Sequence, residues 1–154
     1  MIISIGSDHA GFKHKEEIKE ILNKMGHKVL DMGTDNNDSC DYSVFAIKVA
    51  ENVAMRLSDR GVLVCNTGIG MSIAANKVKG CYAALVRNNK DAFVSRHHNN
   101  SNIICFGAER NNPDEIKQML EIWLNEEFDK GRHERRINLI KSYENNHFIG
   151  GSDE

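Results

Sequence analysis

The sequence predicts an α/β protein that is doubly wound around a parallel β-sheet of five strands. Short apolar segments alternate with longer amphipathic segments, the pattern of strands separated by crossover helices. The apolar segments are nearly continuous, as strands covered by helices on both faces require. In sheets of this kind ligands bind outside the carboxyl ends of the strands, and this rule selects the residues to test for function.

The first part of the chain contains two short strands and the helix between them. Residues 2–6 are apolar, and residues 12–25 carry apolar side chains at helical spacing. Gly26 follows, where a helix C-cap glycine belongs. Residues 27–31 form the second strand, and residues 33–39, rich in aspartate and asparagine, form a surface loop.

The middle of the chain repeats this alternation. Residues 41–57 are predicted to be helical because apolar side chains recur at every fourth position. Residues 62–65 form the third strand, and residues 69–77 form the helix after it. A strand over 81–86 and a helix over 89–97 follow.

The last part supplies the fifth strand and two helices. Residues 102–106 are apolar and form the strand. Residues 113–128 form a helix that begins with Pro113, a residue favoured in the first turn. Residues 132–143 form the last helix.

The size and composition are those of one soluble domain. The 154 residues, 40% hydrophobic and 27% charged, suffice for a sizeable core. We expect residues 1–149 to form the domain and residues 150–154 to form a flexible tail. The net charge of −2 gives no basic field that would attract nucleic acid or an acidic membrane. No apolar stretch approaches the roughly 20 residues that span a bilayer, and the N-terminal residues do not resemble a signal peptide.

The cysteines and histidines do not have the spacing of a metal site. Cys40, Cys65, Cys81 and Cys105 are widely separated, which indicates reduced thiols in a cytoplasmic protein instead of a disulfide framework. The adjacent His97-His98 pair would point about 100° apart on a helix. We therefore expect no metal.

The segment after the third strand is the most informative candidate site. Cys65 ends an apolar run and opens into Asn66-Thr67-Gly68-Ile69-Gly70, where a glycine-bearing turn begins a helix. A helix start offers unpaired backbone N–H groups and a partial positive charge, which favour a thiolate and hold an anion. A cysteine at a strand end is, by itself, more often a small buried hydrophobic residue.

Other polar segments also fall at predicted strand or helix ends. Ser7-Asp8-His9 follows the first strand, and Gly107-Ala108-Glu109-Arg110 follows the fifth. Residues 96–100, Arg-His-His-Asn-Asn, end a helix. Arg132 and Arg136 are four residues apart on one side of the last helix, a spacing that suits a phosphate clamp. The plain alternatives are that His9 caps the first helix and that the arginines form a solvated face.

Several familiar sites are excluded by a missing residue. Gly68 and Gly70 are followed by Ile73 where a dinucleotide fingerprint needs its third glycine. No lysine follows Gly70 to make a Walker loop. A cysteine-dependent phosphatase would need an arginine at the position of Met71.

Together these segments resemble ribose-5-phosphate isomerase type B, in the family that includes the galactose-6-phosphate isomerase subunits. The resemblance covers nearly the whole chain and rests on the order and spacing of several motifs. These are Gly6 to Gly11, Asp41-Tyr42, Cys65 to Gly70, Ser72 to Lys77, Ser95 to Asn99, Asn102 to Gly107, and Gly131 to Arg136. It implies a Rossmann-like doubly wound sandwich and a single isomerase domain. It also implies a cofactor-free, metal-independent aldose–ketose isomerase whose sites are shared between the subunits of a homodimer or homotetramer.

The resemblance also implies a role for each candidate residue. Cys65 would move the proton between C2 and C1, with Thr67 assisting it, and His98 would open the furanose ring. The expected substrate contacts are the backbone N–H groups of Gly68, Ile69 and Gly70 on the enediolate, Asp8 and Asn99 on the sugar, His9, Arg132 and Arg136 on the phosphate, and Tyr42 and Asn66 lining the pocket.

Three departures from the family pattern bear on this interpretation. Asn66 stands where glycine is common, and asparagine tolerates the left-handed backbone better than other non-glycine residues. Ser43 stands where a proline is usual. Met71 occupies the position at which some relatives carry a glutamate base, so the thiol is the expected base here.

The retained cysteine, histidine and arginine set favours ribose 5-phosphate, an intermediate of the pentose phosphate pathway, as the substrate. One alternative is a six-carbon substrate such as allose 6-phosphate or galactose 6-phosphate. The other is a non-catalytic sugar-phosphate-binding module on the same fold.

Overall fold

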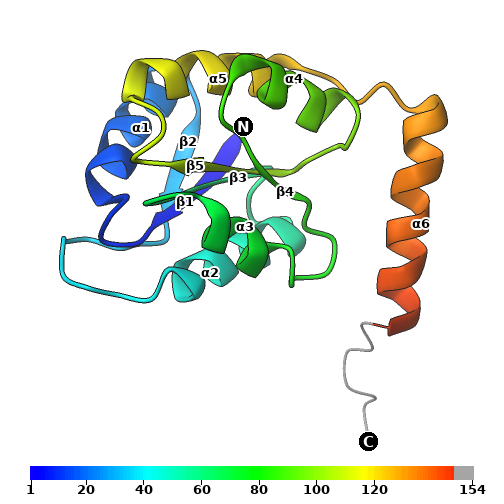
Figure 1. Ribbon diagram of the computed structural model, residues 1–154, viewed down its shortest axis with the longest axis horizontal. Coiled ribbons are helices and arrows are strands. Elements are labelled where there is room, and N and C mark those ends of the chain that lie inside the picture. Colours follow the sequence, from blue (N-terminus) through cyan, green and yellow to red (C-terminus); the bar gives the residue numbers. More distant parts are fainter. Residues whose placement is uncertain (148–154) are drawn as a thin grey trace, which may run out of the picture.

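Five parallel strands form one sheet at the centre of the protein (Figure 1). The structure is a computed structural model that describes residues 1–147. The strand order is β2-β1-β3-β5-β4, which confirms the predicted doubly wound α/β class with five parallel strands. The strands are β1 (Ile2–Ser7), β2 (Lys28–Asp31), β3 (Arg60–Cys65), β4 (Ala83–Leu85) and β5 (Ile103–Gly107).

Helices cover both faces of the sheet, and each face has its own apolar core (Figure 1). On one face lie α1 (Phe12–Lys24), α4 (Asn89–His97) and α5 (Pro113–Asn125), packed around the buried Trp123 and Phe106. On the other face lie α2 (Tyr42–Ala54) and α3 (Ile69–Ala75). No helix among residues 1–147 is long and apolar enough to cross a membrane.

The chain changes direction across the sheet between the adjacent strands β1 and β3. β1 leads into α1 on one face, whereas β3 leads into α3 on the other, so the loops after these strands part at their carboxyl ends. This is the switch point at which doubly wound folds bind ligands. Gly11 allows α1 to start here, because a Cβ on Gly11 would lie 2.4 Å from the carbonyl oxygen of Val64.

Both edge strands are short, four residues in β2 and three in β4. The outer edge of β4 is occupied by the side-chain amide of Asn76, which pairs with the backbone of Ala83. Asn76 Nδ2 donates to the Ala83 carbonyl oxygen at 2.8 Å, and the Ala83 N–H donates to Asn76 Oδ1 at 2.8 Å. The amide therefore takes the place that a neighbouring strand would take.

The last helix, α6 (Gly131–His147), stands apart from the body of the protein beside β4 (Figure 1). Near its far end Glu144 accepts hydrogen bonds from the Tyr82 hydroxyl at 3.3 Å and the Gly80 N–H at 3.4 Å. Burial and the Glu144 charge raise the pKa of Tyr82 to about 12, so the phenol remains a donor. Leu139, with 69% of its surface exposed, belongs to a helix face that residues 1–147 leave uncovered.

Several helix boundaries differ from the prediction, and the helix predicted over 69–77 ends at Ala75. The helix predicted over 41–57 ends at Ala54, because Arg56 takes a left-handed φ of 59° and leaves Leu57 exposed. The helix predicted over 113–128 ends at Asn125, where the chain becomes extended at Glu126. The last helix runs longer than 132–143, and the predicted tail lies outside the described residues.

A buried lysine ties α1 to the end of β2. Lys15, whose side chain is 1% exposed, donates to Asp31 Oδ2 and lies 2.9 Å from Glu16, and Lys19 also reaches Asp31 at 2.6 Å. Partial burial alone would raise the pKa of Asp31. The hydrogen bonds from Lys15, Lys19 and the Gly33 N–H outweigh it, so the pKa lies below its usual value.

Asp31→Asn should lower the free energy of unfolding at pH 7 by about 1–3 kcal/mol, because it leaves Lys15 with a weaker partner. A carboxyl group whose pKa is lowered by folding stabilises above its unfolded pKa and loses that effect as the pH falls. The difference from the wild type should therefore shrink below about pH 4 in urea titrations. Glu20→Gln, in an exposed pair with Lys24, is the control and should change little. A difference that stays constant from pH 7 to pH 2.5 would contradict this assignment.

Candidate active site

The Cys65 thiol lies at the carboxyl end of β3, where the β3–α3 turn folds back over it. The Gly68 N–H donates to Cys65 Sγ at 3.1 Å, and Cys65 is 5% exposed. A hydrogen bond from a backbone N–H favours the thiolate, the form of cysteine that accepts a proton or attacks an electrophile. The structure therefore places the predicted thiol and the predicted turn in direct contact.

The turn depends on Gly68. This residue has a left-handed φ of 77°, a conformation in which a side chain is strained. A Cβ there would also lie 2.6 Å from Leu85 Cδ1 and 2.9 Å from the carbonyl carbon of Phe106. Glycine is thus required twice at this position, once by the backbone and once by the neighbouring strands.

Two of the three N–H groups expected to hold an oxyanion are engaged within the turn. The Gly68 N–H donates to Cys65, and the Ile69 N–H donates to Thr67 Oγ1 at 3.3 Å. Within residues 1–147 the Gly70 N–H has no acceptor. A negatively charged oxygen at this turn could therefore accept directly from the Gly70 N–H. The Gly68 and Ile69 N–H groups could also bind it if they released the side chains of Cys65 and Thr67.

Two more predicted residues lie near this turn. Asp8 follows β1, its N–H donates to the Val64 carbonyl oxygen at 3.3 Å, and its carboxylate accepts from the Gly11 N–H at 3.0 Å. The Tyr42 ring lies against Gly70, where a Cβ would meet it at 2.6 Å.

His9 lies beside the loop before α2, because its Nδ1 accepts from the Cys40 N–H at 3.2 Å. The structure does not support the alternative that His9 caps α1. The N-cap residue of that helix is Gly11, and no side chain forms a capping hydrogen bond there.

The other thiols near β3 are held protonated. Burial raises the pKa of Cys105 far above its usual range, and the charge of the neighbouring Cys65 raises it further. Burial, and then the charge of Glu144, raises the pKa of Cys81 to about 11. Cys81 also donates to the Ala50 carbonyl oxygen at 3.1 Å. Neither thiol is suited to proton transfer near neutral pH.

A second cluster joins the end of α4 to the start of α6. His98 caps α4, and its ring stacks on His133 with centroids 4.2 Å apart and planes 9° apart. Burial, and then the positive charges of His98, Arg132 and Arg136, lowers the pKa of His133. Both arginines are exposed, as the solvated-face alternative also requires, and Asn99 lines the hollow between α6 and β4. Positive charge is therefore concentrated beside His98, as an anion site requires.

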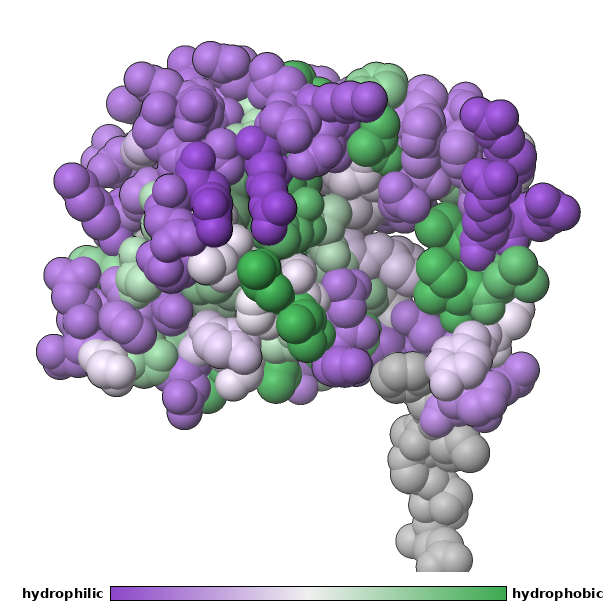
Figure 2. All heavy atoms as spheres, viewed as in Figure 1, coloured by the Kyte–Doolittle hydropathy of each residue, from purple (hydrophilic) through white to green (hydrophobic). Residues whose placement is uncertain are grey.

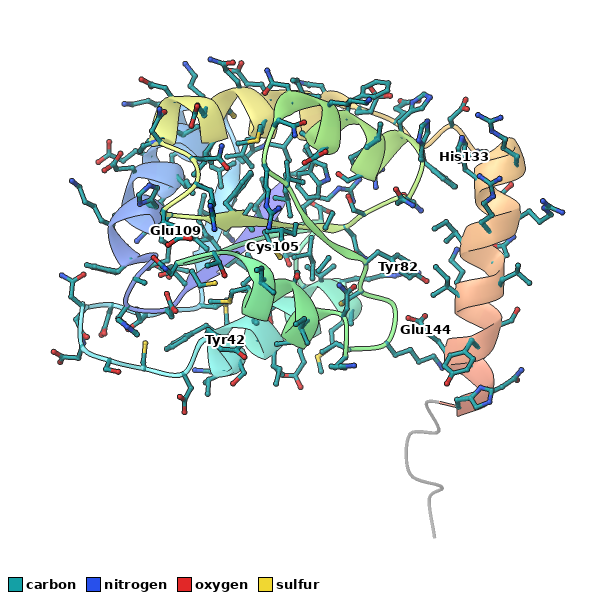
Figure 3. The ribbon with its side chains drawn as sticks, in the orientation of Figure 1. Tyr42, Tyr82, Cys105, Glu109, His133 and Glu144 are labelled. Atoms are coloured by element: carbon teal, nitrogen blue, oxygen red, sulfur yellow. The ribbon has the colours of Figure 1, made fainter. Side chains whose placement is uncertain are left out.

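The two clusters lie at opposite edges of the sheet. α4 begins after the carboxyl end of β4 and ends before the amino end of β5, which puts His98 near the amino edge. Cys65 lies at the carboxyl edge, and the five-residue β5 alone spans roughly 15 Å. Figure 3 shows Glu109 and Tyr42 at one end of the molecule and His133 at the other. A single chain does not bring Cys65 and His98 together.

Sequence reasoning missed two residues of these clusters. His133 lies within the Gly131 to Arg136 motif, and nothing in its spacing signals a stack on His98. Glu109 stands in the strand-end segment after the fifth strand that the sequence singles out, but the family resemblance implies no catalytic or binding role for it. In the structure its carboxylate accepts a hydrogen bond from the Asn66 side chain at 2.8 Å.

The chain is similar to known proteins along most of its length. A family model described as Ribose/Galactose Isomerase matches residues 3–140. The putative sugar phosphate isomerase YwlF of Bacillus subtilis is 43% identical over 145 residues, 94% of this chain and 97% of that protein. Ribose-5-phosphate isomerase B of Escherichia coli is 38% identical, covering 92% of this chain and 95% of that protein. The galactose-6-phosphate isomerase subunit LacB of Clostridium acetobutylicum is 37% identical, covering 97% and 91%.

Solved structures share the fold. Ribose-5-phosphate isomerase B of Clostridium thermocellum superposes with a TM-score of 0.93 at 44% identity, covering 96% of this chain and 99% of that one. The Mycoplasma genitalium enzyme, solved with bound ribulose-5-phosphate, gives a TM-score of 0.90 at 39% identity, covering 94% and 96%.

Gly68→Ala should destabilise the protein more than Gly80→Ala. Both glycines have a positive φ, 77° and 82°, but only Gly68 has neighbours in the way of a Cβ. Backbone strain of about 1–2 kcal/mol should affect both variants, and overpacking should add about 1–3 kcal/mol at Gly68. Urea midpoints measure the difference. Equal losses would mean that the Leu85 and Phe106 contacts relax without cost.

Proposed function

The chain belongs to the ribose/galactose isomerase family, and we propose that it is a member that interconverts ribose 5-phosphate and ribulose 5-phosphate. The family placement makes it a sugar-phosphate isomerase that exchanges an aldose and a ketose. The observation that carries the proposal is the Cys65 thiol, held by the Gly68 N–H in a turn at the switch point of the sheet.

Cys65 is the proposed base. Its thiolate takes the proton from C2 of the open-chain aldose and returns it to C1 of the enediolate, while the hydroxyl proton passes from O2 to O1, which yields the ketose. A positioned base contributes roughly 10²–10⁴-fold to such a step. The negative charge that develops on oxygen is met by the N–H groups of the turn, and each such donor is worth about 2.7–4 kcal/mol in related sites. Thr67, whose hydroxyl is bonded to the Ile69 N–H, assists at the same place.

His98 is the proposed ring-opening residue, because imidazole donates and accepts protons near neutral pH. Arg132 and Arg136, with His9, bind the phosphate away from the reacting carbons, so that binding energy orients the substrate. Asp8, Asn99, Tyr42 and Asn66 complete the walls around the sugar. Every step is thereby assigned to a group of this chain.

A five-carbon substrate is favoured over a six-carbon one. The relative from Mycoplasma genitalium was solved with ribulose-5-phosphate, and the Escherichia coli relative is named for ribose 5-phosphate. The similarity to a galactose-6-phosphate isomerase subunit keeps a six-carbon sugar as the second candidate. One extra hydroxymethyl group changes only the depth of the pocket.

The proposed site is completed by a second copy of the chain. Cys65 and His98 lie at opposite edges of one protomer, so a neighbouring copy has to bring its own His98 to Cys65. Apolar side chains that a partner could cover gather over α3 and on α6 (Figure 2). Among them, Ile69 is 44% exposed, Ile73 is 57% exposed and Leu139 is 69% exposed. We infer a homodimer, or a homotetramer built from two such dimers, with shared sites.

Cys65→Ala should abolish isomerisation while leaving the fold intact. The assay measures ketose formation from ribose 5-phosphate, allose 6-phosphate and galactose 6-phosphate, and the wild type should convert the ribose compound with the highest kcat/KM. The variant should lose at least about 10²-fold in kcat. Cys81→Ala, a buried thiol outside the turn, is the matched control for losing a sulfhydryl group. Full turnover by Cys65→Ala would contradict the thiol mechanism. A higher kcat/KM for galactose 6-phosphate than for ribose 5-phosphate would contradict the proposed substrate.

Mixing two inactive variants should restore activity if the site is shared. In a dimer of one Cys65→Ala chain and one His98→Ala chain, one site receives both intact residues and the other receives neither. Random exchange of equal amounts should recover about a quarter of the wild-type activity, since half the dimers are mixed. Each variant alone should remain inactive. Mixed dimers that are detected by mass spectrometry but show no activity would place Cys65 and His98 of the same chain in one site.

A further inference from the structure

The loop after β5 is joined to the Cys65 turn along its backbone. The Ala108 N–H donates to the Cys65 carbonyl oxygen at 2.8 Å, and the Glu109 N–H donates to the Asn66 carbonyl oxygen at 3.1 Å. The loops approach so closely at Gly107 that a Cβ there would lie 2.8 Å from the Thr67 carbonyl. These contacts bring the Glu109 side chain to the residue that follows the proposed base.

The Glu109 carboxylate divides its two oxygens between two partners. Oε2 accepts from Asn66 Nδ2 at 2.8 Å, whereas Oε1 pairs with Arg110 at 3.0 Å. A carboxylate only accepts hydrogen bonds, so Asn66 has to turn its NH₂ group toward Glu109. The amide oxygen Oδ1 then faces away from Glu109, and within residues 1–147 no donor bonds to it. Without the Glu109 carboxylate, this hydrogen bond is lost, and the NH₂ group and the oxygen of the Asn66 amide could exchange places.

We propose that Glu109 is a positioning residue that fixes the orientation of the Asn66 side-chain amide beside Cys65, so that Asn66 presents a hydrogen-bond acceptor to the sugar. The inference rests on the proposed function and assigns a task to a residue outside the proposed catalytic set. Sugar hydroxyl groups donate hydrogen bonds, and an acceptor in a fixed place orients the carbon that carries them. A small misplacement at such a contact lowers the rate by as much as about 10²-fold.

Glu109 and Asn66 are both exposed, so their bond contributes little to the core. Truncation at Glu109 should therefore leave the fold intact, and an effect on catalysis can be separated from an effect on stability. Phosphate binding should also be unaffected, because the Glu109 carboxylate pairs with Asn66 and Arg110 and with none of the proposed phosphate ligands His9, Arg132 and Arg136. A positioning role thus predicts a loss in kcat with little change in KM.

The test compares four variants in the assay on ribose 5-phosphate. Glu109→Ala should lower kcat about tenfold or more with KM within about twofold of the wild type. Glu109→Gln can accept from Asn66 Nδ2 or donate to Asn66 Oδ1, so it holds the side chain without fixing its orientation and should recover only part of the activity. In the Asn66→Ala background, Glu109→Ala should cause no further loss. Glu121→Ala, which truncates an exposed, ion-paired glutamate on α5, should match the wild type.

Several results would overturn the inference. They are an unchanged kcat in Glu109→Ala, a loss seen only in KM, a wild-type kcat in Glu109→Gln, or a further loss of kcat when Glu109→Ala is added to Asn66→Ala.

A readout independent of turnover separates this inference from the proposed function. The Asn66 side-chain NH₂ signal, identified in ¹H–¹⁵N spectra by its disappearance in Asn66→Ala, should shift strongly in Glu109→Ala. If the wild type converts no sugar phosphate, the proposed function fails, and this signal still decides whether Glu109 holds Asn66. An unchanged signal overturns the inference whatever the activity.

Discussion

The left-handed backbone at Gly68 is the constraint on which the candidate site depends. It turns the chain back over the end of β3, so that the Gly68 N–H meets Cys65 Sγ at 3.1 Å and α3 starts on the opposite face from α1. The strands β5 and β4 press against the same position through Phe106 and Leu85. The core of the sheet therefore fixes the geometry of the thiol, and no flexible loop has to close to create it.

The topology separates the Cys65 thiol from the cluster of positive charge. Residues of the β1 and β3 ends surround the thiol, whereas the α4 and α6 ends gather His98, His133 and two arginines. A parallel sheet with its crossover helices puts strand ends and helix ends at opposite edges, so this separation follows from the fold. In the proposed homodimer, the symmetry between two copies would bring the Cys65 end of one chain to the His98 end of the other.

Much of this arrangement could be predicted from the sequence. Apolar runs located all five strands, and the strand-end rule selected Asp8, Cys65 and Glu109 correctly as neighbours of the switch point. The end of α2 could not be predicted, because Leu57 continues the apolar stripe while the backbone at Arg56 leaves the helix. The Asn66–Glu109 bond joins residues 43 positions apart, and pairings of that kind depend on tertiary structure.

The Asn76 amide on β4 has a consequence for how copies of this chain can associate. An open sheet edge invites another strand to add to it, which leads to filaments and aggregates. At Ala83, the backbone N–H and carbonyl on the outer edge of β4 are already hydrogen-bonded to the Asn76 side chain, so they cannot pair with an added strand. Addition of a strand at β4 is therefore disfavoured at Ala83, while the opposite edge offers only the four residues of β2.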